Sequence, residues 1–299
     1  MTEDRRLYLL KKKLGEKAKI DVPLANYTTF KIGGPADLFY EAETETELIQ
    51  AVKLSRERGA PFFILGGGSN LLVSDKGFRG LVIRIQDTRY KIQDTRIVAW
   101  AGTPLAKLVE AAAEDFLSGL EFCVGIPGTI GGAVVGNAGI KEKAIGDLVE
   151  KVRVLDEKGE EIDLSQKQCQ FQYRASRFQK ESKVILEVVL KLTKKSEPAI
   201  REEMVRFLED RKDQPREPSA GSIFKNPPGK SAGELIDQVG LKGESLGQAQ
   251  IAAEHANWII NLGGASCQDV LKLILLAKKK IKEQFGIELR EEIRVVGGQ

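Results

Sequence analysis

The stretch GIPGTIGGAVVGNAG, residues 125–139, limits the possible folds of this chain more than any other feature. It holds six glycines in fifteen positions, interleaved with the aliphatic residues Ile126, Ile130, Val134 and Val135. Glycine inside a regular element costs about 0.5–1 kcal/mol relative to alanine, so this density requires positive φ or backbone pressed against another group. A flexible linker would not contain the aliphatic residues, which belong in a core or against a ligand. The stretch therefore predicts a binding surface made of backbone.

The length and composition indicate a globular protein with more than one domain. A chain of 299 residues has room for two or three cores, and 42% hydrophobic with 30% charged residues is typical of folded proteins. Lys plus Arg number 46 and Asp plus Glu 43, so no strong field attracts nucleic acid or a membrane, and we expect neither as a partner. No signal peptide or apolar window of about 18 residues is present, which predicts a cytoplasmic protein.

Cysteine and histidine are too few for several kinds of site. Cys123, Cys169 and Cys267 are odd in number and far apart, which fits neither a disulfide framework nor zinc ligation. His255 is the single histidine, so a Ser-His-Asp triad is not expected. We predict buried, inert thiols, a structural or surface imidazole, and no metal site.

Short strands and helices alternate along the chain. A helix over residues 44–59 is predicted by the capping box of Thr44 and Glu47, and a strand and the loop GGGSN follow it. A second round has a strand near residues 97–102, Thr103 and Pro104 as the cap and first residue of a helix, and then the glycine-rich stretch. Further expected elements are a hairpin over 150–165, a strand over 184–192, helices over 198–212, 232–240 and 268–285, and strands over 255–261 and 291–296.

This order of elements predicts an α+β fold. We expect residues 1–200 to form a two-part module of short mixed sheets and helices, divided near residue 95. Residues 201–299 should form a smaller α+β domain, whose final strand is a candidate to return to the first module.

The loop GGGSN, residues 66–70, is a candidate anion site. Adjacent glycines let backbone N–H groups converge on a phosphate, although a tight turn between strands explains the same sequence. No lysine follows the glycines as in a P-loop, and Gly125, Gly128 and Gly131 are three residues apart, unlike a Rossmann fingerprint. Two such loops suggest a different way of holding a dinucleotide, with both loops around one phosphate chain.

Six motifs together resemble a known family. The chain is similar, over nearly its whole length and in the right order, to the UDP-N-acetylenolpyruvoylglucosamine reductase (MurB) family in its shorter type. The motifs are NYTTFKIGGPADL, ILGGGSNLLVSD, GIPGTIGGAVVGNAG, YRASRF, GSIFKNP and LREEIRV.

The resemblance implies an FAD-binding module of the vanillyl-alcohol-oxidase type followed by a substrate domain. FAD should be non-covalent, because no histidine lies between residues 26 and 140. Tyr173, Lys225 and Asn226 would contact substrate. The cofactor-binding residues would be Gly66, Gly67, Gly68, Ser69, Asn70, Gly125, Gly128, Thr129, Gly131, Gly132, Ala133, Asn137 and Gly139.

Three residues match the catalytic positions of the family. Ser222 resembles its proton donor, and a turn serine is the plain alternative. Arg174 resembles the residue that holds the substrate carboxylate, and a surface ion pair is the alternative. Glu292 resembles the catalytic glutamate; Glu291 stands beside it where the family often has proline, and strand alternation directs only one of them to the site.

The implied reaction consists of two hydride transfers. NADPH reduces FAD, and the reduced cofactor then converts the enolpyruvyl ether of UDP-N-acetylglucosamine to UDP-N-acetylmuramate for peptidoglycan synthesis, hence for cell shape and division. We expect a monomer. Two alternatives stay open: a flavin oxidase, which would need an oxygen-accessible flavin, and a non-catalytic nucleotide-binding protein. The joint presence of Ser222, Arg174 and Glu292 argues against the second.

Overall fold

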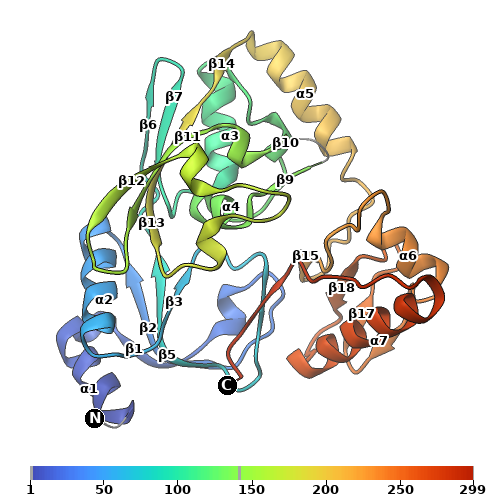
Figure 1. The fold of residues 1–299 in the computed structure, drawn as a ribbon, viewed down its shortest axis with the longest axis horizontal. Coiled ribbons are helices and arrows are strands. Elements are labelled where there is room, and N and C mark those ends of the chain that lie inside the picture. Colours follow the sequence, from blue (N-terminus) through green and yellow to red (C-terminus); the bar gives the residue numbers. More distant parts are fainter. Residues whose placement is uncertain (1–2, 141–142, 299) are drawn as a thin grey trace. The chain divides into compact units, whose positions relative to one another are not determined.

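The computed structural model describes residues 3–140 and 143–298 and divides the chain into two compact units. Unit 1 contains residues 1–18, 40–67 and 82–212. Unit 2 contains residues 19–39, 68–81 and 213–299. The chain therefore passes between the units several times (Figure 1), and two segments that the sequence analysis assigned to the first module group with the C-terminal part.

Unit 1 is built around a five-stranded antiparallel sheet in the order β12–β11–β13–β7–β6. Strands β2 (Pro35–Ala42) and β5 (Phe78–Ile85) begin in unit 2 and end in unit 1, where β5 neighbours β3. The other elements of unit 1 are α1 (Glu3–Leu14), α2 (Glu45–Glu57), β3 (Phe62–Leu65), β6 (Tyr90–Gln93), β7 (Arg96–Trp100), α3 (Leu105–Glu114), β8 (Leu117–Ser118), α4 (Ile130–Gly136), β9 (Gly139–Ile140), β10 (Lys143–Ala144), β11 (Val149–Leu155), β12 (Glu161–Ser165), β13 (Val184–Lys191), β14 (Thr193–Lys194) and α5 (Glu197–Glu209).

The core of unit 1 lies between this sheet and the helices α3, α4 and α5. Val152, Val188 and Ile97 from three neighbouring strands are fully buried, and Leu108 of α3 and Val134 of α4 pack into the same cluster. Burying such side chains contributes about 1.5–3 kcal/mol each. The predicted strands over 97–102 and 184–192 thus supply the centre of the sheet.

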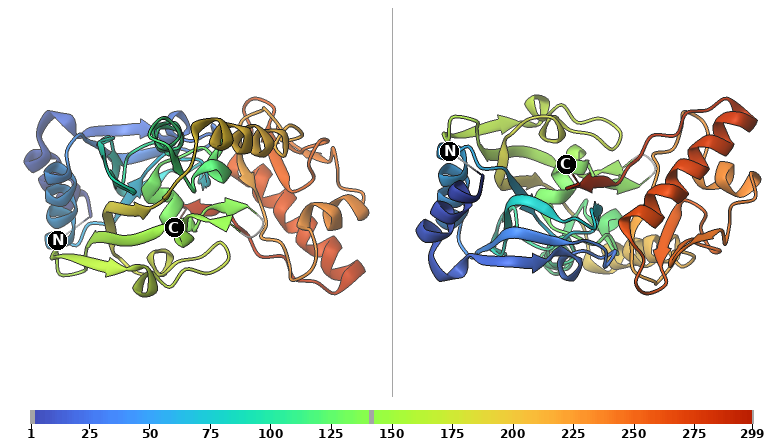
Figure 2. Two further views of the ribbon diagram at one scale, coloured as in Figure 1. Left: turned by 90° about the horizontal axis from the view of Figure 1, so that it is seen from above. Right: turned by 90° about the horizontal axis from the view of Figure 1, so that it is seen from below.

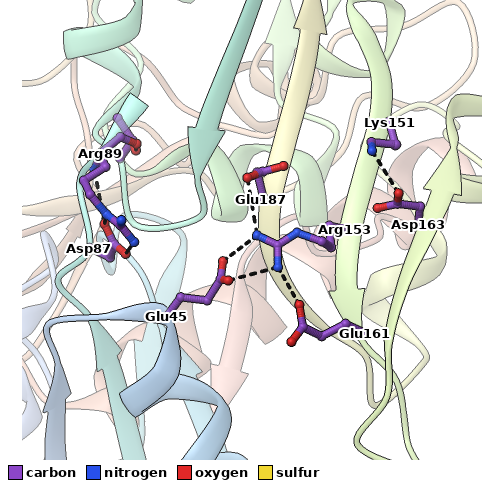
Figure 3. A network of polar contacts seen from close by, with 9 residues as sticks. Glu45, Asp87, Arg89, Lys151, Arg153, Glu161, Asp163 and Glu187 are labelled. Atoms are coloured by element: carbon purple, nitrogen blue, oxygen red, sulfur yellow. Dashed lines mark hydrogen bonds and ion pairs between the residues drawn. The ribbon is translucent and has the colours of Figure 1, made fainter. Parts of the chain in front are cut away.

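An arginine on the sheet of unit 1 joins three acidic side chains. Figure 3 shows the Arg153 guanidinium between the carboxylates of Glu45, Glu161 and Glu187, at 2.7, 2.6 and 3.3 Å. Burial alone would lower the pKa of Arg153, but the hydrogen bonds and negative charge of these carboxylates raise it above its ordinary value. Glu45 begins α2, so the network links this helix to β11, β12 and β13.

The predicted caps of the helices are largely confirmed. The Thr44 hydroxyl accepts the Glu47 N–H at 3.2 Å, and Gly59 follows the helix with a φ of 61°. Pro104 differs by one position, because its ψ of 133° is extended and makes it the N-cap of α3.

Unit 2 contains a four-stranded antiparallel sheet in the order β15–β18–β17–β16. Strand β1 pairs antiparallel with the first part of β2, and β19 pairs with β4 in parallel, with Arg294 opposite Leu71. The elements of unit 2 are β1 (Lys19–Pro23), β4 (Leu71–Val73), β15 (Ser219–Ser222), α6 (Ala232–Gln238), β16 (Ser245–Leu246), β17 (Ala249–Ile251), β18 (Trp258–Asn261), α7 (Cys267–Phe285) and β19 (Arg294–Val296).

The long helix α7 covers the sheet of unit 2 (Figure 2). Its N-terminus is fixed twice, because Ser266 and Asp269 form a capping box and the Asp75 carboxylate accepts the Cys267 N–H at 2.8 Å. Its C-terminus is Phe285, followed by Gly286 at φ 68°, as predicted. The buried face of α7 packs against Ile259 and also against residues from the two earlier segments of unit 2, Phe30, Ile32 and Leu72.

In the ranges 3–140 and 143–298, no helix is long and apolar enough to cross a membrane. The same described residues contain no group of three or more His, Cys, Asp or Glu side chains that could hold a metal ion.

Candidate active site

The two glycine loops meet by backbone contact within unit 1. A Cβ atom on Gly67 would lie 2.6 Å from Gly128 Cα, and one on Gly66 would lie 2.7 Å from Thr129 Oγ1. Neither Gly66 nor Gly67 has positive φ, so these two positions require glycine because of the close approach of the other loop. The predicted convergence of the two loops is therefore present in the fold.

The glycine-rich stretch contains a short helix, α4, that the sequence analysis treated only as backbone surface. Thr129 caps it by accepting the Gly132 N–H at 3.4 Å. The Gly131 N–H donates to Ala101 O at 2.9 Å, and a Cβ on Gly131 would lie 2.9 Å from that same oxygen, so glycine allows α4 to pack against Ala101, directly after β7. Ala133 is buried in the core of unit 1.

One face of α4 carries no side chains at Gly132 and Gly136. Gly132 and Gly136 are four residues apart and so share a face; a Cβ on Gly132 would meet only Thr129 Oγ1, at 3.6 Å, and one on Gly136 would meet nothing within 4 Å. Glycine inside a helix costs about 1 kcal/mol relative to alanine. The absence of side chains at Gly132 and Gly136 leaves space beside the joined loops of Gly67 and Gly128. This space fits a flat or extended cofactor that lies along the face.

Asn137 ends α4 and holds the segment that carries Arg174. It adopts a φ of 46°, its Nδ2 donates to Gln172 O at 2.8 Å, and its Oδ1 accepts the Gly146 N–H at 2.9 Å. Gln172 and Ala175 close a tight turn by two hydrogen bonds, and Arg174 lies in it with a φ of 49°. The side chain of Asn137, predicted to bind cofactor, is thus engaged within the protein, and it positions the Arg174 turn.

Other predicted residues of unit 1 lie around these features. Tyr173 is 53% exposed, and the Arg174 guanidinium lies 5.5 Å from its ring centroid. A Cβ on Gly139 would lie 2.1 Å from Lys143 O, so this glycine allows β9 and β10 to pair. A Cβ on Gly125 would lie 3.2 Å from Arg211 Cδ.

Ser222 and Glu292 come together in unit 2. The Glu292 N–H donates to Ile223 O at 2.8 Å, and the Lys225 N–H donates to Arg290 O at 2.9 Å. The segment after β15 and the segment before β19 therefore lie side by side as short extended chains. Ser222 thus directly precedes a residue, Ile223, that is hydrogen-bonded to Glu292, although Ser222 and Glu292 are 70 positions apart in the sequence.

Of the other predicted residues of unit 2, Asn70 contacts Glu292. Gly68, at φ 65°, packs on Tyr27, and partly exposed Ser69 follows it. Asn70 Nδ2 donates to Glu292 O at 3.1 Å, so the loop GGGSN contributes to both units. Asn226 Oδ1 accepts the Ala232 N–H at 2.9 Å at the start of α6.

Glu291, which the sequence left beside Glu292 without a role, has an ion pair of its own. Its carboxylate lies 2.8 Å from Lys278 Nζ on α7. Glu291 therefore links the final segment to the helix of unit 2.

Sequence reasoning missed Asn257, which holds the Ser222 segment. Its Nδ2 donates to Phe224 O at 2.8 Å, its Oδ1 accepts the Phe224 N–H at 2.9 Å, and its backbone O accepts the Ile223 N–H at 2.8 Å. Asn257 is 4% exposed, so water does not compete for these bonds. The only sequence signal was a polar residue at the start of the apolar run WII.

Asn257→Ala should loosen this segment. It would leave the buried N–H and C=O of Phe224 without their partner, and we expect the free energy of unfolding to fall by about 2–4 kcal/mol. Urea unfolding measures this loss, and hydrogen exchange at the Phe224 amide should become faster. Asn257→Asp is the matched control: it keeps the acceptor for Phe224 N–H but places an oxygen against Phe224 O. Unchanged exchange at Phe224 in Asn257→Ala would contradict the assignment.

The cysteines and His255 lie outside this chemistry. Cys123, Cys169 and Cys267 are buried free thiols, and burial raises the pKa of each above its ordinary value. Burial lowers the pKa of His255, whose Nδ1 accepts the Asn257 N–H at 3.3 Å. His255 therefore supports the Asn257 contact as a neutral ring, which agrees with the predicted structural imidazole.

Two family models match the chain. Residues 36–165 match an FAD binding domain, which includes both glycine loops. Residues 213–296 match the C-terminal domain of UDP-N-acetylenolpyruvoylglucosamine reductase, which includes Ser222 and Glu292.

Whole-chain comparisons agree with these models. The chain is 44% identical over 284 residues to UDP-N-acetylenolpyruvoylglucosamine reductase of Caldanaerobacter subterraneus subsp. tengcongensis, covering 94% of both chains. It is 41% identical over 285 residues to the reductase of Clostridium tetani, covering 94% of this chain and 93% of that protein. The crystal structure of the reductase from Thermus caldophilus matches with a TM-score of 0.82 and 39% identity, covering 94% of this chain and 98% of that chain. By this identity over nearly its whole length, the chain belongs to the UDP-N-acetylenolpyruvoylglucosamine reductase family.

Proposed function

We propose that this chain reduces the enolpyruvyl ether of UDP-N-acetylglucosamine enolpyruvate to UDP-N-acetylmuramate, with FAD as cofactor and NADPH as electron donor. The observation that carries the proposal is the pairing of residues 223–225 with residues 290–292, because it places the segments that carry Ser222 and Glu292 side by side in the matched C-terminal domain. The family membership supplies the substrate.

The residues of unit 1 fit the cofactor. FAD would lie along the bare face of α4 at Gly132 and Gly136, with its pyrophosphate near the joined loops of Gly67 and Gly128. When bound, FAD supplies a two-electron transfer from NADPH to the vinyl carbon distal to the substrate carboxylate.

The protein must then stabilise negative charge on the substrate. Addition of a hydride to the distal vinyl carbon forms a C–H bond there and moves the π electrons of the C=C bond to the neighbouring carbon, which becomes an enolate with its carboxylate. Arg174 can hold a carboxylate through two parallel hydrogen bonds, and a protonated Glu292 can donate a hydrogen bond to the enolate. Both interactions strengthen as the charge develops, which is the condition for lowering the barrier.

Ser222 completes the reaction as the proton donor to the α-carbon. A serine hydroxyl is a weak acid, but an enolate carbon is strongly basic and the position of the hydroxyl is fixed by its strand. The contacts that fix it are the pairing of Ser222 with Trp258 and the bonds that Asn257 makes to the next two residues. Lys225, Asn226 and Tyr173 are proposed to contact the UDP-sugar.

The setting of the reaction belongs to the same proposal. UDP-N-acetylmuramate is a peptidoglycan precursor, so the protein would act in the cytoplasm in cell-wall synthesis, with effects on cell shape and division. We propose that it acts as a monomer with non-covalent FAD. Light scattering would give the oligomeric state, and acid precipitation should release the flavin into the supernatant.

Stopped-flow absorbance tests the function. NADPH should bleach the flavin of the purified protein under anaerobic conditions, and the enolpyruvyl ether should then restore the absorbance within the time of one turnover. Oxygen alone should restore it far more slowly. Fast reoxidation by oxygen with no response to the enolpyruvyl ether would overturn the proposal and favour a flavin oxidase.

A further inference from the structure

Arg211 lies just beyond the end of α5, in the part of unit 1 that contains the glycine-rich stretch. Its backbone N–H donates to Leu208 O at 3.0 Å, which continues the helical turn. Its side chain is partly buried, and among the residues that the structure describes, its Nε and Nη2 have no hydrogen-bond partner. Leaving buried charged donors unpaired is costly, so such donors require an acceptor such as a water molecule, an ion or a ligand.

The side chain of Arg211 rests on Gly125, the first glycine of the stretch GIPGTIGG. A Cβ at Gly125 would lie 3.2 Å from Arg211 Cδ and 3.7 Å from its Nε. A side chain at Gly125 is disfavoured for two reasons: the φ of 75° strains any residue other than glycine, and a Cβ would crowd the Arg211 side chain. The glycine thus leaves room for the guanidinium beside the loop that the matched FAD-binding domain contains.

The charges around Arg211 do not neutralise it. Burial lowers the pKa of Arg211, and the positive charge of Arg174 lowers it further, while exposed Asp210 acts in the opposite direction. The nearby Cys123 thiol offers no anion at neutral pH, because burial raises its own pKa far above its ordinary value. The positive charge of Arg174 therefore acts unfavourably on the charged form of Arg211.

We propose that Arg211 and Arg174 form an oxyanion-binding site beside Gly125, in which Arg211 is a binding residue for a carboxylate or phosphate group of a ligand. An oxyanion would give the buried Nε and Nη2 of Arg211 acceptors in the fork geometry that guanidinium groups prefer, and would offset the unfavourable effect of the Arg174 charge on Arg211. This inference rests on the proposed function, which offers two such groups: the carboxylate of the enolpyruvyl substrate and the pyrophosphate of FAD.

The test uses the full-length protein with its flavin and three variants, Arg211→Gln, Arg211→Lys and Arg206→Gln. Arg206 is the matched control, because it is an exposed arginine of α5 whose guanidinium lies 5.4 Å from the Phe207 ring centroid. Flavin absorbance changes report the Kd of two ligands: UDP-N-acetylmuramate, which carries the carboxylate, and UDP-N-acetylglucosamine, which lacks it. Flavin fluorescence on dilution reports the Kd of FAD.

Arg211→Gln should raise the Kd of the ligand that carries the bound oxyanion by about tenfold to a hundredfold, as expected for a lost charge-assisted hydrogen bond. If the substrate carboxylate is the partner, UDP-N-acetylmuramate should bind more weakly while UDP-N-acetylglucosamine and FAD are unchanged. If the partner is the pyrophosphate, FAD itself should bind more weakly. Arg211→Lys should recover part of the loss, and Arg206→Gln should match the wild type.

Two results would overturn the inference. The first is an Arg211→Gln protein that binds FAD and both UDP-sugars as the wild type does. The second is loss of the folded circular-dichroism spectrum in both Arg211 variants, which would make Arg211 a structural residue. Failure of the wild type to bind UDP-N-acetylmuramate would instead count against the proposed function, and the FAD measurement would still decide the role of Arg211.

Discussion

Ser222→Ala should bind FAD and be reduced by NADPH at nearly the normal rate, yet be reoxidised by the enolpyruvyl ether on the order of 10²-fold more slowly. The hydroxyl takes no part in the electron transfer from NADPH, whereas the α-carbon needs its proton. The substitution removes one oxygen from β15 and leaves its backbone pairing with Trp258 in place. Stopped-flow absorbance measures the two half-reactions separately on the same preparation.

A second variant distinguishes loss of the proton donor from distortion of the site. Ser222→Cys should recover part of the lost rate, since a thiol in the same position is a stronger acid. Equal slowing of both half-reactions in Ser222→Ala would mean that the site is distorted, and the assignment of Ser222 as proton donor would fail.

Gly67→Val should abolish FAD binding. The new Cβ would lie 2.6 Å from Gly128 Cα, which belongs to backbone and cannot rotate away as a side chain could. The two loops would have to separate, and the surface that they form together would be lost. The ratio of flavin to protein absorbance in the purified variant measures the effect.

Gly240→Ala is the control for general destabilisation. Gly240 has a φ of 69°, so alanine is strained there, but a Cβ would meet nothing within 4 Å. This variant should keep its flavin at full occupancy. Full occupancy in Gly67→Val as well would show that the contact between the two loops is not needed for the cofactor.

Local sequence patterns predicted the elements whose signals are local. Helix α2 begins at the predicted cap Thr44, although the Glu47 carboxylate accepts the Glu43 N–H and so does not complete the predicted capping box, and α7 ends before Gly286. The same patterns predict a binding surface made of backbone, and no helix, for the stretch that contains α4, where Gly131, Gly132 and Gly136 lower the helix propensity. Packing of Val134 and Ile130 in the core of unit 1 outweighs that propensity.

The site was predicted where a motif marks the residue and missed where only geometry does. Ser222, Arg174 and Glu292 were found through the resemblance. Asn257 and Arg211 belong to no quoted motif: Asn257 makes hydrogen bonds to a segment 33 residues away, and Arg211 has a partly buried guanidinium beside Gly125. Contacts between distant parts of a chain leave no periodic trace in its sequence.

The three separate segments of unit 2 have a consequence for protein synthesis. Asn70 and Glu292 are 222 residues apart and share a hydrogen bond. During synthesis, Asn70 therefore leaves the ribosomal exit tunnel long before Glu292 is added to the chain. Until then the apolar side chains of Phe30, Ile32 and Leu72 lack the helix that finally buries them. Nascent chains expose such residues to aggregation and to chaperones. A message truncated before codon 294 would thus yield β4 without its parallel neighbour.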